Sequence, residues 1–330
     1  MQERQRKTAA VLAVVLGSAF ALLGAAPLAP QPGPAPSLRD EVDAATAARR
    51  NQGCITCHER EAEEWSTSAH ATSASNEAFL AALEREQPRR HDFCLDCHAP
   101  ERRSSARDPV AEGLGVACVT CHVPLGAILA SPGAAPGPHG VLRPAWFAGT
   151  DACTRCHQFD FPGAGWPIQD TIDESVELFD LSCQSCHMRA GGRTSHRFPG
   201  GYDLAFARRA VDVTASRDGD EVTFVLIPTP PHAVPTGDMF RRLRLILRDG
   251  ERVLAERFFG RRFERRDGTL HELRDDRLHA TPRRVTLKIP DAGPLSWSLY
   301  LERVAYAPSA NPDEDVIDGR LELARGTLAP

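Results

Sequence analysis

The sequence predicts two regions of different fold class. The first, residues 46–207, is α-rich but dominated by loops, and the second, residues 208–330, is all-β and antiparallel. Two observations predict this division. All ten cysteines lie between Cys54 and Cys186, and after Ala210 the cysteines stop and apolar residues begin to alternate with polar ones.

Five copies of one short motif use every cysteine. The motif is C-x-x-C-H, in which a histidine directly follows a pair of cysteines. In c-type haem attachment the two thiols bind the porphyrin as thioethers, and the adjacent histidine becomes the proximal ligand of the iron. The sequence therefore predicts five covalently attached haem c groups. The attaching cysteines are Cys54, Cys57, Cys94, Cys97, Cys118, Cys121, Cys153, Cys156, Cys183 and Cys186, and the proximal ligands are His58, His98, His122, His157 and His187.

Two other uses of cysteine fit the motif less well. Structural zinc sites pair two C-x-x-C units and need no histidine directly after each one. Disulfide bonds suit an exported protein with an even number of cysteines, but they too predict no adjacent histidine. Five histidines in the same position therefore favour haem over both alternatives.

The N-terminus predicts export, which haem c attachment requires. Three basic residues precede an apolar run within residues 1–26, and a Pro/Ala-rich linker over residues 27–45 follows. This pattern is typical of a signal peptide or an N-terminal anchor, and both remain open because the run is near the lower limit for spanning a bilayer. We expect a periplasmic (extracytoplasmic) protein that touches a membrane only through this segment, if it is uncleaved.

Few residues are available around each predicted haem, because all five motifs lie between Cys54 and His187. Side chains alone cannot enclose so many porphyrins, so the porphyrins themselves should form the core, since metal binding can supply folding free energy. Neighbouring haems must then lie near contact, which allows rapid electron hopping. The chain is thus expected to be an α-rich, loop-dominated multihaem cytochrome domain followed by an all-β, antiparallel sandwich-like C-terminal domain.

Local patterns predict the helices of the first region. Residues 44–71 are rich in helix formers around the first motif, and residues 76–87 form one amphipathic pattern. Residues 124–144 are full of proline and glycine and should be irregular. The inward residues of the second helix are expected to be Phe79, Leu80 and Leu83.

Of the twelve histidines, five are proximal, so seven remain as possible distal ligands. A low-spin iron needs a second axial ligand, and imidazole is the usual one where methionine is scarce. Four of the seven lie beside small, turn or proline residues, or where a helix should end, and are predicted to be distal ligands. They are His70, His139, His196 and His232.

The remaining histidines are weaker candidates. His91 lies three residues before Cys94, too close to reach the far face of that motif's own haem easily, and its role stays open. His271 and His279 lie in a charged stretch and are expected on the surface. If only four distal histidines exist, one iron is five-coordinate, which would be the place for catalysis or small-ligand binding.

Six stretches resemble the motifs of bacterial multihaem c-type cytochromes related to the tetrahaem electron acceptor of hydroxylamine oxidoreductase. They are "CHEREAEEWSTSAHA", "FCLDCHAP", "GVACVTCHVP", "CTRCHQFDFP", "CQSCHMRAGGRTSHRFPGGYD" and "PPHAVPTGD". In that group the elements W-x-x-S-x-H and H-x-x-P-T-G mark distal histidines, which the resemblance implies for His70 and His232. It covers residues 50–240. The related tetrahaem protein has one five-coordinate haem, and this chain departs from it in motif count and in its long C-terminal extension.

The C-terminal region repeats one hairpin design. Residues 210–228 and residues 242–260 each contain two β-rich runs joined by a turn, "RDGD" or "RDGE". Alternation from Leu243 to Leu247 has the period of a half-buried strand. Two further runs, residues 283–290 and 295–306, give six or so strands, which favours an antiparallel sandwich.

Charge excludes one class of partner. The formal net charge is −5, acidic residues are interspersed among the Arg-Arg pairs, and no series of stacking aromatics accompanies them. We therefore expect the arginine pairs to lie on solvated faces, and we expect no nucleic-acid partner. His232 falls between the second and third predicted strands, so ligation through it would clamp the β region onto the haem region.

Electron relay between redox partners is the favoured function. Expected partners are redox donors and acceptors, such as a membrane quinol-oxidising complex or another multihaem cytochrome. The alternative is a haem oxidoreductase that acts on a small nitrogen or sulfur compound at one five-coordinate iron, and a third is a sensor or structural module of a cytochrome assembly. No catalytic constellation can be assigned from the sequence, so whether the protein is an enzyme stays open.

Overall fold

The computed structural model describes residues 42–330, apart from 104–106, 161–165, 177–180, 268 and 291–292. The predicted signal peptide or anchor and nearly all of the predicted linker lie outside these residues. Within the described ranges, every helix is too short or too polar to cross a bilayer.

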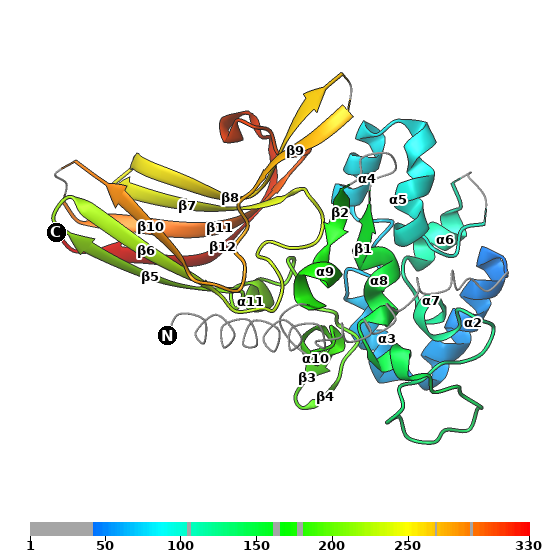
Figure 1. Ribbon diagram of the computed structural model, residues 1–330. Coiled ribbons are helices and arrows are strands. Elements are labelled where there is room, and N and C mark those ends of the chain that lie inside the picture. Colours follow the sequence, from blue (N-terminus) through cyan, green and yellow to red (C-terminus); the bar gives the residue numbers. More distant parts are fainter. Residues whose placement is uncertain (1–41, 104–106, 161–165, 177–180, 268, 291–292) are drawn as a thin grey trace, which may run out of the picture. The chain divides into compact units, whose positions relative to one another are not determined.

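Short helices and small sheets make up the first region, with irregular chain between them (Figure 1). The prediction of an α-rich region is therefore only partly confirmed. Its helices are α2 (Ala44–Cys57), α3 (Glu59–Ser66), α4 (Glu77–Arg85), α5 (His91–His98), α6 (Pro109–Leu114), α7 (Cys118–His122), α8 (Asp151–His157), α9 (Thr171–Val176), α10 (Gln184–His187) and α11 (Leu204–Ala207). Two antiparallel pairs join β1 (Gln158–Asp160) to β2 (Pro167–Asp170) and β3 (Arg189–Ala190) to β4 (Arg193–Thr194).

Local capping explains where these helices begin. The Asp43 side chain accepts a hydrogen bond from the Thr46 N–H at 2.6 Å, and Asn76 caps α4 through the Phe79 N–H at 2.9 Å. The amphipathic prediction for α4 is confirmed, with Leu83 buried and Phe79 half-buried. Residues 124–144 are irregular as predicted, and a short 3₁₀ helix begins at Ala145 directly after them.

The C-x-x-C-H motifs lie at helix ends. Four motif helices end at the histidine itself, and α2 ends at Cys57 so that His58 separates it from α3. In a helical turn, residues i, i+3 and i+4 share one face. Each motif therefore presents two thiols and one imidazole toward the same side. The four helices that end at a histidine are α5, α7, α8 and α10.

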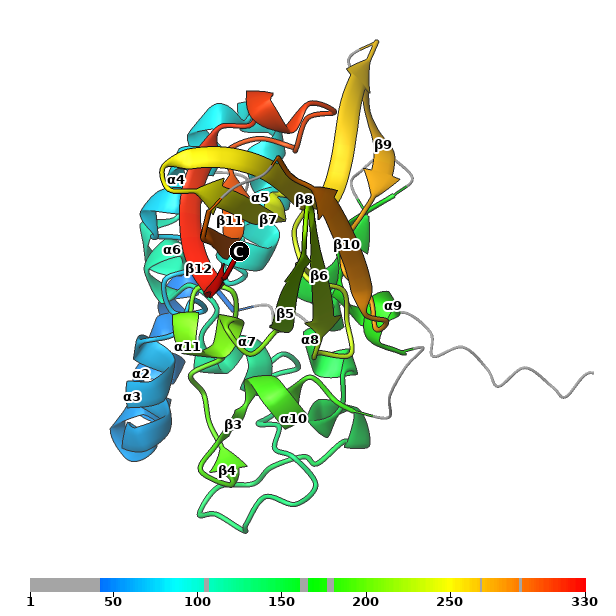
Figure 2. The same cartoon turned by 90° about the vertical axis from the view of Figure 1, so that its left-hand side faces the viewer.

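The C-terminal region is a pair of antiparallel sheets that share one core (Figures 1 and 2). One sheet has the order β10-β6-β5 and the other the order β12-β11-β7-β8-β9. Buried residues of both sheets, such as Phe224 and Trp297, meet with ring centroids 5.7 Å apart. The strands are β5 (Val211–Asp218), β6 (Glu221–Pro228), β7 (Arg241–Asp249), β8 (Arg252–Arg266), β9 (Thr269–Asp275), β10 (Arg283–Lys288), β11 (Leu295–Val304) and β12 (Ile317–Leu328).

Both predicted hairpins are present, and their turns use glycine. Gly219 and Gly250 have φ of 58° and 55°, a left-handed conformation that glycine adopts without steric cost. Two strands, β9 and β12, were not predicted, because their sequences are too charged or too interrupted to show clear alternation. The half-buried pattern predicted for Leu243–Leu247 is wrong, since Ile246 is also buried in this central strand.

Several arginines are buried, which contradicts the prediction that the arginine pairs are solvated. Arg242 is only 3% exposed and donates to Glu302 at 2.8 Å, and its guanidinium also pairs with Asp315. Glu302 is fully buried and also accepts from Arg244 and Arg320. Carboxylates from β11 and from the chain before β12 thus neutralise guanidinium groups that are buried inside the β region.

Removing Glu302 should destabilise the β region. Glu302→Ala removes the buried carboxylate that Arg242, Arg244 and Arg320 share, and breaking a buried ion pair in this way costs roughly 3–5 kcal/mol. Chemical unfolding followed by circular dichroism measures the change. Glu322→Ala on β12 is the control, because its partner Arg325 is largely exposed, and loss of this pair should shift stability by less than about 0.5 kcal/mol. Equal effects of both substitutions would contradict a role for the buried network.

Candidate functional site

Four pairs of histidines face each other, three within the first region and one between it and the loop that joins β6 to β7. In each pair one member follows a C-x-x-C unit and the other is a predicted distal ligand. The ring centroids are 6.1 Å apart for His58 and His139, 6.2 Å for His70 and His157, 6.1 Å for His122 and His196, and 6.3 Å for His187 and His232.

This spacing fits two imidazoles that bind one metal ion from opposite sides. A metal–nitrogen bond to imidazole is about 2 Å long and each ring centre lies about 1 Å behind its nitrogen, so the centroids should be roughly 6 Å apart. Rings in direct contact would be closer. All four predicted distal histidines take part, and each pairs with a proximal histidine from a different part of the chain.

Backbone carbonyls fix the orientation of several of these rings. Nδ1 of His98 donates to the Ser73 oxygen at 2.7 Å, Nδ1 of His122 to Leu129 at 2.8 Å, and Nδ1 of His187 to Pro199 at 2.7 Å. A hydrogen bond from Nδ1 leaves the Nε2 lone pair for a metal, which is the usual second contact of ligating histidines. The donor set therefore fits an axially ligated haem iron.

Desolvation by the surrounding protein keeps the imidazoles in the neutral form that binds metals. It lowers the pKa of His70 and of His157 to about 4, with smaller contributions from neighbouring positive groups. Desolvation likewise lowers the pKa of His122, His196 and His232. Because protonated imidazole is no ligand, these environments favour coordination.

His98 differs from the other four proximal histidines. No second imidazole faces it among the twelve histidines, all of which the structure describes. Its ring stacks instead on Phe79, with centroids 4.0 Å apart and planes 12° from parallel. His91 lies near Glu86, whose carbonyl oxygen is 3.3 Å from its Nε2, while His271 and His279 are exposed.

Sequence patterns do not predict the contact between Phe79 and His98. The pattern placed Phe79 on the inner face of a helix, but it carries no information on which motif that face meets. The contact follows from the chain after His70, where Ser73 reaches His98. The Ser73 hydroxyl donates to the His98 carbonyl oxygen at 2.7 Å and so joins the two segments.

A tight turn supports the segment that carries His70. The Val116 N–H donates to the His70 carbonyl oxygen at 2.9 Å, and the Trp65 Nε1–H donates to the Val116 oxygen at 2.8 Å. Gly115 has φ of 58°, and a Cβ there would lie 2.5 Å from the His70 oxygen. Only glycine allows the chain before the third motif to approach His70 this closely.

The loop with His232 is held by a buried carboxylate. Glu174 of α9 accepts from the Ala233 N–H at 3.1 Å and from the Thr236 hydroxyl at 2.8 Å, and it also pairs with Arg277. The loop joins β6 to β7, as predicted for His232. These contacts attach the chain between the two sheets to the first region beside His187.

Thiols of different motifs also lie close together. Cys97 lies beside Cys156, and Cys153 lies beside Cys183. The motifs that carry these thiols are therefore neighbours in the fold.

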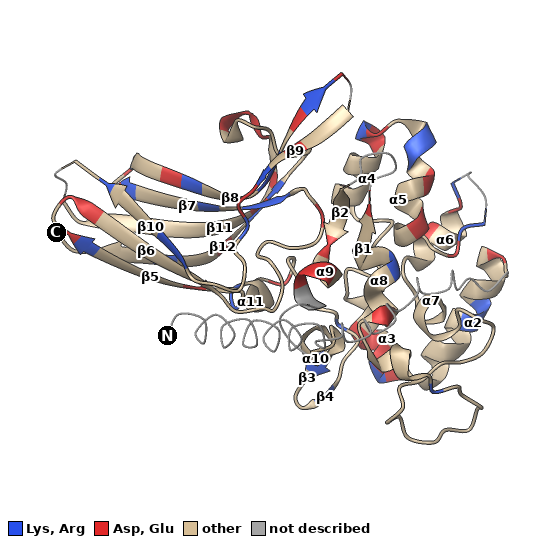
Figure 3. Cartoon of the chain, in the orientation of Figure 1, with Lys and Arg blue, Asp and Glu red and all other residues tan. Residues whose placement is uncertain are grey.

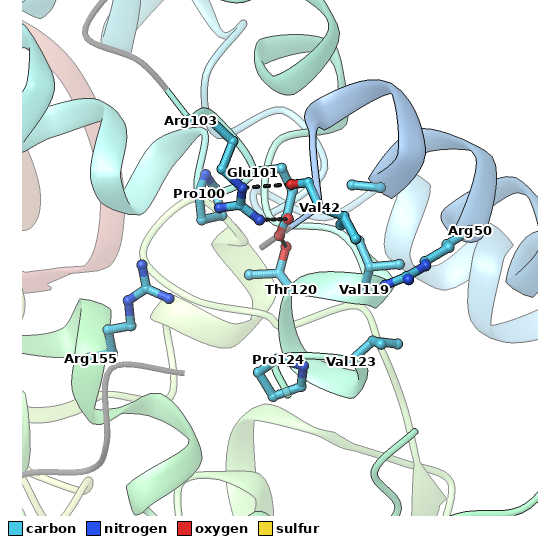
Figure 4. A pocket seen from close by; sticks show the side chains of 11 residues that line it. Val42, Arg50, Pro100, Glu101, Arg103, Val119, Thr120, Val123, Pro124 and Arg155 are labelled. Atoms are coloured by element: carbon cyan, nitrogen blue, oxygen red, sulfur yellow. Dashed lines mark hydrogen bonds and ion pairs between the residues drawn. The ribbon is translucent and has the colours of Figure 1, made fainter. Parts of the chain in front are cut away.

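A pocket lies beside the third motif (Figure 4). It has room for about one water molecule and is lined by Val119 and Thr120 of α7, with three arginines around it. Guanidinium groups match carboxylates such as porphyrin propionates in both charge and shape. The three arginines, Arg50, Arg103 and Arg155, come from α2, from the chain after α5 and from α8.

Comparison with known proteins is consistent with this geometry. The model of a family described as "Cytochrome c554 and c-prime" matches residues 53–123, which include the first three motifs. The chain is similar to the crystal structure of a penta-heme cytochrome c552 from Thermochromatium tepidum, with a TM-score of 0.69 and 23% identity, over 84% of this chain and 98% of that one. A search of curated proteins gave no match. The chain therefore has a multihaem cytochrome fold, and the partial family match supports a multihaem c-type cytochrome.

Proposed function

We propose that the protein is an extracytoplasmic pentahaem c-type cytochrome that relays electrons between redox partners. One observation carries the proposal: four predicted proximal–distal histidine pairs stand 6.1–6.3 Å apart. Bound haem would supply reversible one-electron exchange at iron. The similar cytochrome c552 is a penta-heme protein, and the five motifs of this chain are consistent with the same number.

The C-x-x-C-H motifs and the four histidine pairs indicate which residues would hold the haems. Each C-x-x-C unit would form two thioethers, and the following histidine would bind iron. His139, His196, His70 and His232 would complete the irons of His58, His122, His157 and His187, respectively. A closer relationship to the acceptor of hydroxylamine oxidoreductase stays a prediction.

Spatial proximity between motifs indicates the order of the five sites. His58 lies within electrostatic range of His122, the Cys121 thiol within range of the Cys156 thiol, and the His157 imidazole within range of both His98 and His187. The Phe198 ring lies against two predicted distal histidines. Its centroid is 4.5 Å from that of His70, which faces His157, and 5.9 Å from that of His196, which faces His122. We propose a row running from the His58 site through the His122 site to the His157 site, which then adjoins the His98 and His187 sites.

One end of this row is the best placed for exchange with a partner. His58, His139 and His157 are exposed and the other paired histidines are half-buried, but among the described residues only the His58 site adjoins an uncharged, exposed apolar stretch. The neighbouring stretch from Pro124 to Leu142 carries no charged residue and exposes Leu125 and Leu142, which are 54% and 55% exposed. Weak redox complexes use small contact surfaces, and we propose that a donor or acceptor docks at this end.

A second candidate function concerns His98. Its lack of a facing imidazole favours an iron with one open position, where a small nitrogen or sulfur compound could bind or react. One carboxylate that acts electrostatically on His98 is that of Asp238. Electron relay remains the first proposal, because four of the five sites have the paired geometry.

Haem content and spin state test both proposals. The purified, exported protein should carry five covalent haems by mass and by pyridine haemochrome assay. Electron paramagnetic resonance of the oxidised protein should show four low-spin irons and one high-spin iron. Five low-spin signals would rule out the open site at His98, and fewer than five haems would contradict the cofactor assignment.

The high-spin iron should respond to small ligands. Addition of nitric oxide, hydroxylamine or nitrite should change the high-spin signal and leave the low-spin signals unaltered, because only that iron has a free position. Removing the second haem by Cys94→Ala together with Cys97→Ala should abolish the response. A response that survives this double substitution would place the open iron elsewhere.

Substitution of His232 should affect both iron and fold. His232→Ala should turn one further iron high-spin and make the junction between the regions more sensitive to proteolysis, since one metal–nitrogen link between them is lost. His279→Ala, at an exposed histidine of the same region, should change neither property. An unchanged spectrum in the His232 variant would mean that this residue is not a ligand.

A further inference from the structure

Helix α3 contains a carboxylate that is unusual in its burial. The helix carries four glutamates and one arginine, and acidic residues dominate its colouring (Figure 3). Glu64 is 3% exposed, whereas Glu63 beside it is exposed. Charged side chains are rarely buried unless they are paired and hydrogen-bonded. Glu64 must therefore have partners that outweigh its desolvation.

The partners of Glu64 all belong to the segment that ends in His196. Its Oε2 accepts from the His196 N–H at 2.8 Å, and its Oε1 pairs with the Arg193 guanidinium. The Ser195 hydroxyl adds a third bond. The hydrogen bond from Arg193, with the others, lowers the pKa of Glu64 to about 2, so the carboxylate is ionised at all physiological pH values.

The His196 ring lacks the Nδ1 hydrogen bond that fixes His98, His122 and His187. Its Nδ1 is buried with no hydrogen-bond partner in the described structure, whereas Nδ1 of His122 opposite is fixed by a carbonyl. The chain before it also turns through two glycines, Gly191 and Gly192, with φ of 57° and 79°. The position of His196 therefore depends on its backbone, and the backbone is held by Glu64.

We infer that Glu64 is a positioning residue for the iron of His122, acting through the backbone of His196. The inference rests on the proposed function, in which His196 is the distal ligand of that iron. Helix α3 starts directly after His58 and leads to His70, so through Glu64 the same helix supports ligands of three irons. A shift of α3 would then move ligands at neighbouring haem sites of the proposed row.

The test uses the full-length holoprotein with Glu64→Ala, Glu64→Gln and the control Glu63→Gln. Glu64→Ala should turn one low-spin iron high-spin, because the His196 N–H loses its acceptor. Glu64→Gln keeps an acceptor oxygen but removes a negative charge, so that iron should stay low-spin with a raised reduction potential. Glu63→Gln should alter neither, since an exposed charge is screened by solvent and salt.

His196→Ala separates the two possible failures. If it produces a high-spin iron while both Glu64 variants keep the original spectrum and potentials, the inference is overturned and the proposed function stands. If His196→Ala leaves all signals unchanged, His196 is no ligand and both fall. Should Glu64→Ala lose haem or fail to fold, the Gln variant decides: a raised potential supports the inference and an unchanged one overturns it.

Discussion

The first region depends on one constraint: imidazoles that are far apart in the sequence must face each other in space. Its helices are short, and its two own buried apolar clusters are small and separate among the described residues. Each histidine pair joins segments that lie far apart in the sequence, so its geometry requires many loops to be in place at once. Metal binding at such pairs would contribute folding free energy that a side-chain core of this size does not supply.

The β region has the opposite physical character. Its two sheets enclose one continuous apolar core, to which Leu243, Leu299 and Phe224 contribute fully buried side chains. Around its rim, carboxylates neutralise buried guanidinium groups. Such a region has the interior of an ordinary folded domain, and it can serve as a rigid support for the loop that carries His232. Glu174 then ties that loop to the first region.

The histidine geometry also explains why one site stands apart. The segment that begins at His70 bonds to two other parts of the chain. The His70 carbonyl oxygen accepts from the Val116 N–H, and Ser73 hydrogen-bonds to His98. These contacts bring Phe79 of α4 against His98 and leave His91 near Glu86. The same local packing therefore supports the His70 pair and leaves His98 without a facing imidazole.

The sequence by itself determined the features that depend on covalent spacing. Cysteines and histidine within five residues fix each attachment motif, and the glycine turns fix the two long hairpins. The four distal candidates could also be chosen, because turn and proline residues around a histidine are local. Only the tertiary structure decided which histidines pair, that His98 has none, and that Arg242 and Glu64 are buried. Those outcomes depend on contacts between segments that are far apart in the sequence, and spacing along the chain does not determine their distance in space. A charged residue is expected to be solvated unless its buried partner is known.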